Sequence, residues 1–283
     1  MLSIILPAKN EASQLKILLP ELLSKYPDEE IIVVNDGSTD DTIEVCEKNN
    51  VKIVTHPYSK GNGASIKTGA KAATGEILVF MDADGQHSVN DISLLLEKYH
   101  KGYHMVVGSR TLKTQANLWR GIANKAYNLL ASWIVGHTIL DLTSGFRVVN
   151  AMKFRKFLYL LPNGFSYPTT ITMSFFRIGY TVGYVPVNVA SRNGKSHIRL
   201  FRDGARFFLI IFKVGTLYSP LKLFFPISLL CFVTGLGYYI YTYSIQGRFT
   251  NMSALLLITS MLVFLIGLVS EQITSLLYSK EDN

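Results

Sequence analysis

The sequence predicts an α/β domain with a mostly parallel sheet, followed by an amphipathic helix and two membrane-spanning helices. Two observations support this fold class. Short apolar runs alternate with amphipathic helical patterns from residue 2 to about residue 187. Two long segments near the C-terminus, 223–245 and 251–270, contain no charged residue. The first pattern is typical of parallel sheets with right-handed crossovers, and the second is typical of helices that cross a bilayer.

The apolar runs and the helical patterns define the expected elements in chain order. Each strand is a run of four to seven mostly apolar residues, and each helix repeats its apolar residues every three or four positions. The expected strands are 2–6, 31–34, 51–55, 77–81, 105–108 and 181–187. The clearest expected helices are 12–24, 65–74, 91–101 and 119–135. A compact turn is expected at 141–147.

The strand at 77–81 leads directly into two carboxylates, Asp82 and Asp84. Open α/β sheets bind their ligands at the carboxyl ends of the strands. Two hard oxygen ligands there, with Gln86 as a third, suit Mg²⁺ or Mn²⁺ bound to a diphosphate. An acidic turn exposed to solvent is the competing interpretation of this motif taken alone.

A glycine-rich loop, 60–65, precedes the helix pattern that ends near residue 74. It differs from a P-loop because Ile66 stands where a glycine should precede Lys67 and Thr68, so a Walker-type ATPase is excluded. The loop still offers backbone N–H groups and the Lys60 ammonium to a phosphate or a base.

The C-terminal segments are long enough to span a bilayer core, at about 1.5 Å per residue. Two buried core helices are the alternative. Basic residues on one face of 198–218 predict a helix in the membrane interface, with an ordinary surface helix as its alternative. The net charge is +8, and its basic cluster next to a span favours anionic lipid over nucleic acid. The sequence therefore predicts an integral membrane protein. Because basic residues that flank membrane spans lie mostly on the cytoplasmic side, the α/β domain and both termini are expected in the cytoplasm.

Six motifs in one order resemble those of the family 2 glycosyltransferases, within the branch of dolichol-phosphate mannose synthases and polyprenyl-phosphate glycosyltransferases. The motifs are Pro7–Glu11, Val34–Asp40, Lys60–Ala64, Asp82–His87, Gly108–Arg110 and Asp141–Arg147. The resemblance covers about residues 1–200 and implies a GT-A-type nucleotide-sugar-binding domain. The expected domains are therefore 1–197 for catalysis, 198–218 for the interfacial helix and 219–283 for a transmembrane hairpin with spans at about 223–245 and 251–273.

The resemblance also implies a reaction and a set of site residues. The expected enzyme is an inverting hexosyltransferase that uses GDP-mannose or a UDP-hexose, a polyprenyl or dolichyl phosphate acceptor, and Mg²⁺ or Mn²⁺. Residues expected to bind the nucleotide-sugar are Pro7, Asn10, Glu11, Asp36, Lys60, Gly61, Asp82 and Ala83, with Asp36 on the base. Asp84, Gln86 and Asp82 are expected on the metal. Arg120, Arg147, Arg192, Lys195 and Ser196 are expected at the lipid phosphate, and Asp84, Asp141 and Arg110 in catalysis.

Three departures and several alternatives accompany this resemblance. Asn35 stands where many members have Asp, His197 replaces a common Lys, and Arg192 lies two rather than three residues before the glycine of its loop. Asp141 either acts as a general base or orients an arginine. An acceptor with a lipid hydroxyl would need that base, and a non-catalytic membrane scaffold would need no metal ligands. A homo-oligomer is compatible with these features.

Overall fold

The computed structural model describes residues 1–110, 118–164, 166–189, 212 and 215–279. The chain divides into two compact units, and each is described by itself. The first comprises Met1–Trp133 with His137–Ile198, and the second comprises Ile134–Gly136 with Arg199–Asn283.

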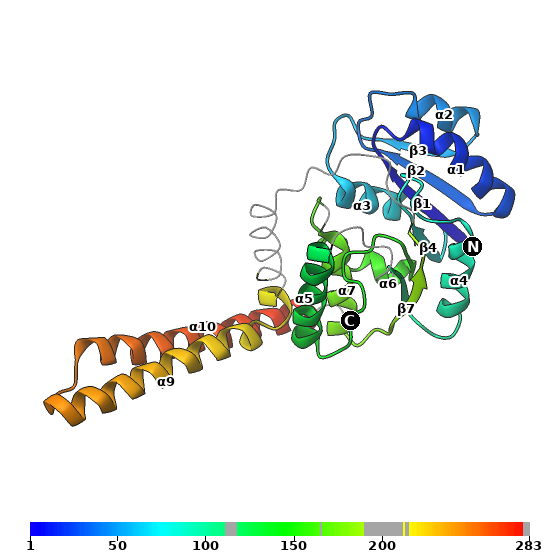
Figure 1. The fold of residues 1–283 in the computed structure, drawn as a ribbon. Helices are drawn as coiled ribbons and strands as arrows, with labels where there is room; N and C mark the ends of the chain where they lie inside the picture. Colours follow the sequence, from blue (N-terminus) through cyan, green and yellow to red (C-terminus); the bar gives the residue numbers. More distant parts are fainter. Residues whose placement is uncertain (111–117, 165, 190–211, 213–214, 280–283) are drawn as a thin grey trace. The chain divides into compact units, whose positions relative to one another are not determined.

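The described part of the first unit contains one seven-stranded sheet with the order β3-β2-β1-β4-β6-β5-β7 (Figure 1). All neighbouring strands are parallel except β6, which runs antiparallel to both β4 and β5. The strands are β1 Leu2–Ala8, β2 Glu30–Asn35, β3 Lys52–Thr55, β4 Ile77–Phe80, β5 Met105–Arg110, β6 Arg147–Asn150 and β7 Val182–Val187. The mostly parallel α/β fold is confirmed. The prediction that 141–147 is entirely a turn is wrong at its end, because Arg147 begins β6.

Helices cover both faces of this sheet. On one face, apolar residues of α1, α2 and α4 join a single core cluster with Ile4, Leu6 and Val33 of the strands. On the other face, Gly69 of α3 approaches Ile5 and Val34 so closely that a larger residue would clash. The helices are α1 Ala12–Lys25, α2 Thr42–Lys48, α3 Asn62–Ala72, α4 Asn90–Tyr99, α5 Leu118–Val135, α6 Ala151–Arg155 and α7 Tyr167–Arg177.

The strand order fixes where a ligand can bind. The chain adds β2 and β3 on one side of β1 and then crosses to add β4 on the other side. The carboxyl ends of β1 and β4 therefore flank the topological switch point, where open α/β sheets bind ligands. Because β6 is antiparallel, its first residue, Arg147, lies beside Phe80 near the end of β4 and beside Val107 of β5. The turn that precedes β6 consequently lies at this same edge of the sheet.

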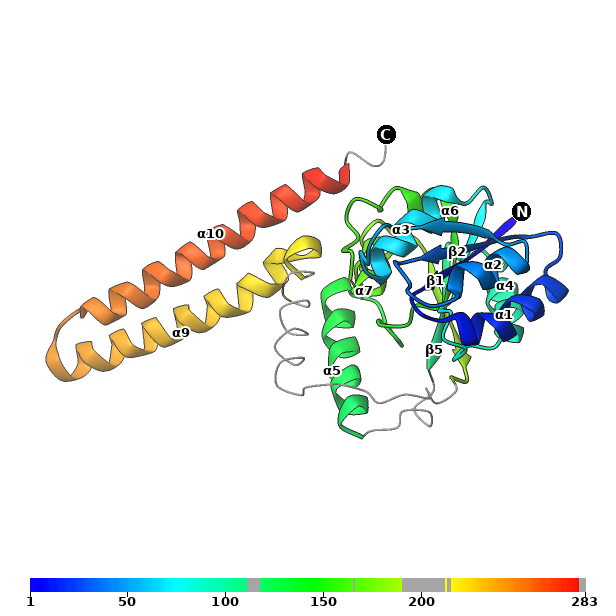
Figure 2. The ribbon, with the colours of Figure 1, turned by 90° about the horizontal axis from the view of Figure 1, so that it is seen from above.

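In the second unit, α9 (Pro220–Gln246) and α10 (Asn251–Ser279) run side by side (Figure 2). Both are long and apolar enough to cross a membrane, and the predicted spans fall inside them. In the most apolar 18-residue stretch of each helix, only 11% and 17% is buried, which is low for core helices of a soluble protein. Ser228 and Ser260 each donate a hydroxyl hydrogen bond to the other's carbonyl oxygen, at 2.8 and 2.9 Å. Most of the predicted interfacial helix, 198–211 and 213–214, lies outside the described residues.

Candidate active site

The loops after β1 and β2 are tied together by Asn10. Its backbone has a left-handed φ of 57°, which asparagine tolerates better than most residues. Its N–H donates to the Ser38 hydroxyl at 2.9 Å, and its side-chain oxygen accepts from the Thr39 N–H at 2.8 Å. Pro7, near the end of β1, and Glu11, just before α1, flank this junction. Three residues predicted to line the nucleoside pocket therefore lie at the switch point.

Asp36 fixes the glycine-rich loop. Its carboxylate accepts hydrogen bonds from the backbone N–H groups of Lys60 and Gly61, at 2.8 and 2.9 Å. It also accepts from the Ser59 hydroxyl and from Nδ1 of His56, both at 2.8 Å. Four donors fill the acceptor capacity of a carboxylate. The structure thus gives Asp36 a role in holding the loop, whereas the resemblance implied a base contact.

The same contacts change the interpretation of the loop itself. The N–H groups of Lys60 and Gly61 point to Asp36, and the N–H of Ala64 donates to the Asn163 carbonyl at 3.1 Å. These groups are therefore committed to the protein, and the prediction that such N–H groups contact a phosphate does not hold for them. Gly61 is required because a Cβ at this position would lie 2.5 Å from the Asn163 carbonyl oxygen.

The paired carboxylates follow β4 directly. Asn62 donates its amide N–H to Asp82 at 3.4 Å, and the N–H of Gln86 donates to Asp84 at 3.1 Å across a tight turn at Gly85, whose φ is +72°. Ala83 is buried. Among the described residues, no group of three or more His, Cys, Asp or Glu side chains is placed so that it could hold a metal ion by itself. The donor set nevertheless fits Mg²⁺ or Mn²⁺ that takes its remaining oxygens from a diphosphate and water.

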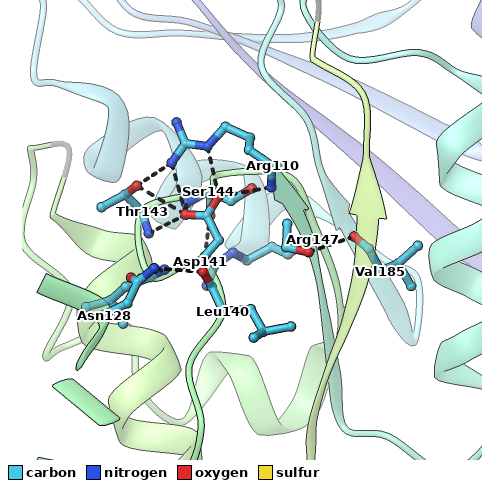
Figure 3. A network of polar contacts seen from close by, with 10 residues as sticks. Arg110, Asn128, Leu140, Asp141, Thr143, Ser144, Arg147 and Val185 are labelled. Atoms are coloured by element: carbon cyan, nitrogen blue, oxygen red, sulfur yellow. Dashed lines mark hydrogen bonds and ion pairs between the residues drawn. The ribbon is translucent and has the colours of Figure 1, made fainter. Parts of the chain in front are cut away.

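Arg110 and Asp141 form a bidentate ion pair at the end of β5 (Figure 3). Nε and Nη2 of Arg110 donate to the two carboxylate oxygens at 2.8 and 2.9 Å. The backbone N–H groups of Arg110, Thr143 and Ser144 donate to the same carboxylate at 3.1 to 3.2 Å. The Asp141 side chain is 9% exposed and that of Arg110 is 32% exposed, so the guanidinium is the partner that solvent reaches.

The pair is ionised at neutral pH. Burial alone would raise the pKa of Asp141, but hydrogen bonds and charge from Arg110, with backbone N–H groups, outweigh it and lower that pKa. The hydrogen bond to Asp141 correspondingly raises the pKa of Arg110. A carboxylate so fully engaged by donors of its own chain is better suited to orient Arg110 than to remove a proton.

Arg147 does not lie where the resemblance placed it. It was expected at the lipid phosphate, yet its side chain is fully buried. Its Nη1 donates to the Pro168 carbonyl at 3.3 Å and to the Thr172 hydroxyl at 3.2 Å, and Nη2 donates to the Ser144 carbonyl. We therefore assign Arg147 to holding the 141–147 turn against α7, with no contact to lipid phosphate.

Other predicted residues are placed only in part. Arg120 lies in the first turn of α5, but its side chain is outside what the structure describes. Arg192, Lys195 and Ser196 also lie outside the described residues. Sequence reasoning missed Asn128 of α5, which bonds to both neighbours of Asp141. A polar residue inside a helical pattern gives no local signal of such a distant contact.

Comparison with known proteins agrees with this geometry. Residues 3–158 match the Glycosyl transferase family 2 model, and residues 219–276 match the GtrB C-terminal hairpin. The family match and the GT-A-like fold are those of a glycosyltransferase. The first match covers more than half of the chain, so the chain belongs to glycosyl transferase family 2.

Similar proteins share either the whole chain or its first unit. Putative glycosyltransferase CsbB of Bacillus subtilis is 27% identical over 98% of this chain and 88% of its own. Dolichyl-phosphate beta-glucosyltransferase ALG5D of Trichomonas vaginalis is 34% identical over 52% of each chain. Glucosyl-3-phosphoglycerate synthase of Mycobacterium tuberculosis, solved with Mn²⁺ and UDP-glucose, has a TM-score of 0.62. It is 19% identical and covers 76% of this chain and 79% of its own, which shows the shared GT-A-like fold.

Proposed function

We propose that this chain is a membrane-bound inverting glycosyltransferase that moves a sugar from a nucleotide-sugar to a polyprenyl or dolichyl phosphate. One observation carries the proposal. Gly145, in the turn that holds Asp141, lies against Asp82, because a Cβ on Gly145 would be 3.3 Å from the Asp82 carboxylate. The carboxylates suited to the donor and the arginine suited to an acceptor phosphate therefore share one edge of the sheet.

The nature of the acceptor is supported by charge and by a relative. An arginine donates charge-assisted hydrogen bonds to phosphate oxygens, and Arg110 is the more exposed member of its ion pair with Asp141. ALG5D is named for a dolichyl-phosphate acceptor, and two apolar helices follow the catalytic unit in this chain. The donor is a UDP-hexose or GDP-mannose. The Mycobacterium tuberculosis enzyme, bound to UDP-glucose, favours the first of these.

The site residues have distinct tasks in the proposed reaction. Asp84 and Gln86, with Asp82, would hold Mg²⁺ or Mn²⁺, which when bound neutralises the charge that develops on the departing diphosphate. Arg110 holds the acceptor phosphate near the sugar, and Asp141 fixes the direction of the guanidinium. Asn10 and Asp36 keep the loops of the nucleoside pocket in place. A lipid phosphate is ionised near neutral pH and needs no strong base, in agreement with the engaged state of Asp141.

The proposal includes an arrangement in the membrane. In this arrangement residues 1–197 are the cytoplasmic catalytic domain and 219–283 are a hairpin with both termini in the cytoplasm. The predicted interfacial segment, 198–218, lies mostly outside the described residues, and its basic residues Arg199, Arg202 and Arg206 suit anionic lipid. Reporter fusions after Asn283 and after Arg248, in the turn between α9 and α10, test this topology. An external signal from the first fusion contradicts it.

The function is tested with the purified full chain in detergent. Radiolabelled UDP-glucose, UDP-galactose and GDP-mannose are each offered with undecaprenyl phosphate, dolichyl phosphate, or the same lipids without phosphate. We expect organic-soluble label only with a lipid phosphate and with one class of donor. Label on the unphosphorylated lipid identifies a hydroxyl acceptor and overturns the proposal. No transfer with any pair, although the nucleotide binds, supports a non-catalytic scaffold.

A further inference from the structure

We propose that Asn128 of α5 is a positioning residue that aims Asp141, and through it Arg110, at the acceptor. The inference rests on the proposed function for its kinetic consequence, but its structural basis is independent. The Asn128 amide donates from Nδ2 to the Leu140 carbonyl at 2.7 Å, and its Oδ1 accepts from the Leu142 N–H at 3.1 Å (Figure 3). One side chain thus holds the backbone on both sides of Asp141, a pair of contacts that we call the Asn128 bracket.

The bracket requires an amide. The Leu140 carbonyl can only accept and the Leu142 N–H can only donate, so the partner must offer one donor and one acceptor from the same planar group. These partners also settle which end of the amide is nitrogen. Aspartate at position 128 would keep the contact with Leu142 but would set a negative oxygen against the Leu140 carbonyl. The asparagine is therefore specific in shape and in chemistry.

The bracket is itself held firmly. Ser132 lies one helical turn after Asn128, and its hydroxyl donates to the Asn128 carbonyl at 2.6 Å while it accepts from the Ile139 N–H at 2.9 Å. On the other side of Asn128, the buried Tyr127 hydroxyl lies 2.8 Å from the Thr169 hydroxyl of α7. The 139–142 segment is thereby fixed to α5, and α5 is fixed to α7. The backbone around Asp141 is set by these contacts as well as by the turn that follows it.

The position of that backbone matters because of its surroundings. Asp141 and Leu142 are both buried, whereas Leu140 is 56% exposed. Without the bracket, the backbone at the exposed Leu140 loses its hydrogen bond to α5. The Asp141 carboxylate can then turn away from Nε and Nη2 of Arg110. A displacement of about 1 Å in a group that positions a reactant can cost a factor of about 10² in rate.

Kinetics of the full chain test the proposal. Asn128→Asp and Asn128→Ala are expected to lower kcat/KM for undecaprenyl phosphate about tenfold or more, with the KM of the sugar donor changed less than about twofold. The matched control is Asn49→Ala, which removes another half-buried asparagine, at the end of α2, whose amide donates to the Val45 carbonyl. It should leave both constants unchanged. An equal rise in the KM of donor and acceptor overturns the positioning role.

A double-mutant cycle separates positioning from general support of the fold. If Asn128 acts through Asp141, Asn128→Ala should cost little further activity in the Asp141→Asn background. Additive losses overturn the proposal. Hydrogen exchange gives a readout without activity: amides of 139–146 should exchange faster in the Asn128 variants, while those of α7 should not. If the wild type transfers no sugar to lipid phosphate, the proposed function fails, and hydrogen exchange alone tests whether Asn128 holds the backbone around Asp141. Unchanged exchange of the 139–146 amides in the Asn128 variants then overturns that role.

Discussion

Gly145 lies directly against the Asp82 carboxylate, with little space for a side chain. A Cβ there would lie 3.3 Å from both the Asp82 carboxylate and the Tyr167 hydroxyl, which is tighter than ordinary packing. Gly145→Ala should therefore push the carboxylate by a few tenths of an ångström and lower transfer several-fold, without unfolding the unit. Gly164→Ala is the matched control because nothing lies within 4 Å of its Cβ position. Equal activity of the two variants would show that the site tolerates the displacement.

The Arg110–Asp141 pair predicts a specific kinetic defect. Asp141→Asn should raise the KM for lipid phosphate more than it lowers kcat, because the guanidinium loses its charged partner but no proton transfer is lost. The low pKa of Asp141 keeps it ionised from mildly acidic to mildly alkaline pH, so the defect should be constant across that range. Steady-state kinetics at several pH values measure this. A fall in kcat of about 10²–10⁴-fold instead identifies a general base.

Metal removal tests the carboxylates after β4. EDTA should abolish transfer, and Mn²⁺ or Mg²⁺ should restore it. Asp84→Asn should also weaken the binding of Mn²⁺ with UDP or GDP, measured by calorimetry without turnover. Asp28→Asn, an exposed aspartate ahead of β2, serves as the control and should bind like the wild type. Full activity of Asp84→Asn in chelator excludes the assignment.

Asp36 predicts a pH-dependent contribution to stability. Burial would raise its pKa, but hydrogen bonds from His56, Lys60, Ser59 and Gly61 outweigh it and lower the pKa to about 2. A depressed pKa stabilises the fold above the unfolded value of about 4, and that stability is lost as pH falls toward the folded value. The contribution is about 2–3 kcal/mol at neutral pH.

The test of Asp36 is thermal unfolding of the wild type and Asp36→Asn in detergent. The variant should be less stable at pH 7, and the difference should shrink by about half near pH 3, because protonation of the unfolded chain removes the advantage of the wild-type carboxylate. Thr42→Val, near Asp40 in the adjacent loop, perturbs the neighbourhood but keeps the Asp36 contacts. A difference that stays constant between these two pH values would show that the charge of Asp36 does not stabilise the fold.

The hairpin contains its own matched pair of glycines. A Cβ on Gly235 of α9 would lie 2.9 Å from the Leu256 Cβ of α10, whereas nothing lies within 4 Å of the Cβ position on Gly237. Close helix packing in membranes depends on such small residues. Gly235→Leu should therefore destabilise the hairpin by about 1–3 kcal/mol, and Gly237→Leu should not. Denaturation in mixed detergent measures the difference, and equal stability of the two variants would show that the close contact at Gly235 does not stabilise the hairpin.

Much of this fold could be predicted because local patterns determine it. The buried strands are continuous apolar runs, so β4 and the carboxylates that follow it are expected at the edge where ligands bind. The antiparallel β6 escapes such a prediction because its pairing partners, β4 and β5, are distant in sequence and its four residues follow a polar turn. The prediction for Arg147 was wrong because an arginine after a turn is normally exposed, whereas the partners that bury this one, Pro168 and Thr172, are 21 and 25 residues away.

The site residues also differ in whether local sequence or distant contacts determine their role. Asp36 is expected at the switch point, but its four donors come from residues 20 to 25 positions away, and no spacing rule identifies them. Asn128 could not be found from the sequence, because its function depends on the path of a loop 12 to 14 residues further along. Residues were predictable where their neighbours along the chain define their role.

The antiparallel direction of β6 has an evolutionary consequence. The chain leaves the sheet at Arg110, the end of β5, and returns to it at Arg147, the start of β6, and both points lie on the rim of the site. This excursion can be lengthened, shortened or exchanged without shifting the register of β1 to β4, which holds the paired carboxylates. Relatives could thus acquire new acceptors by replacing one insert, while the half that handles the donor is inherited unchanged.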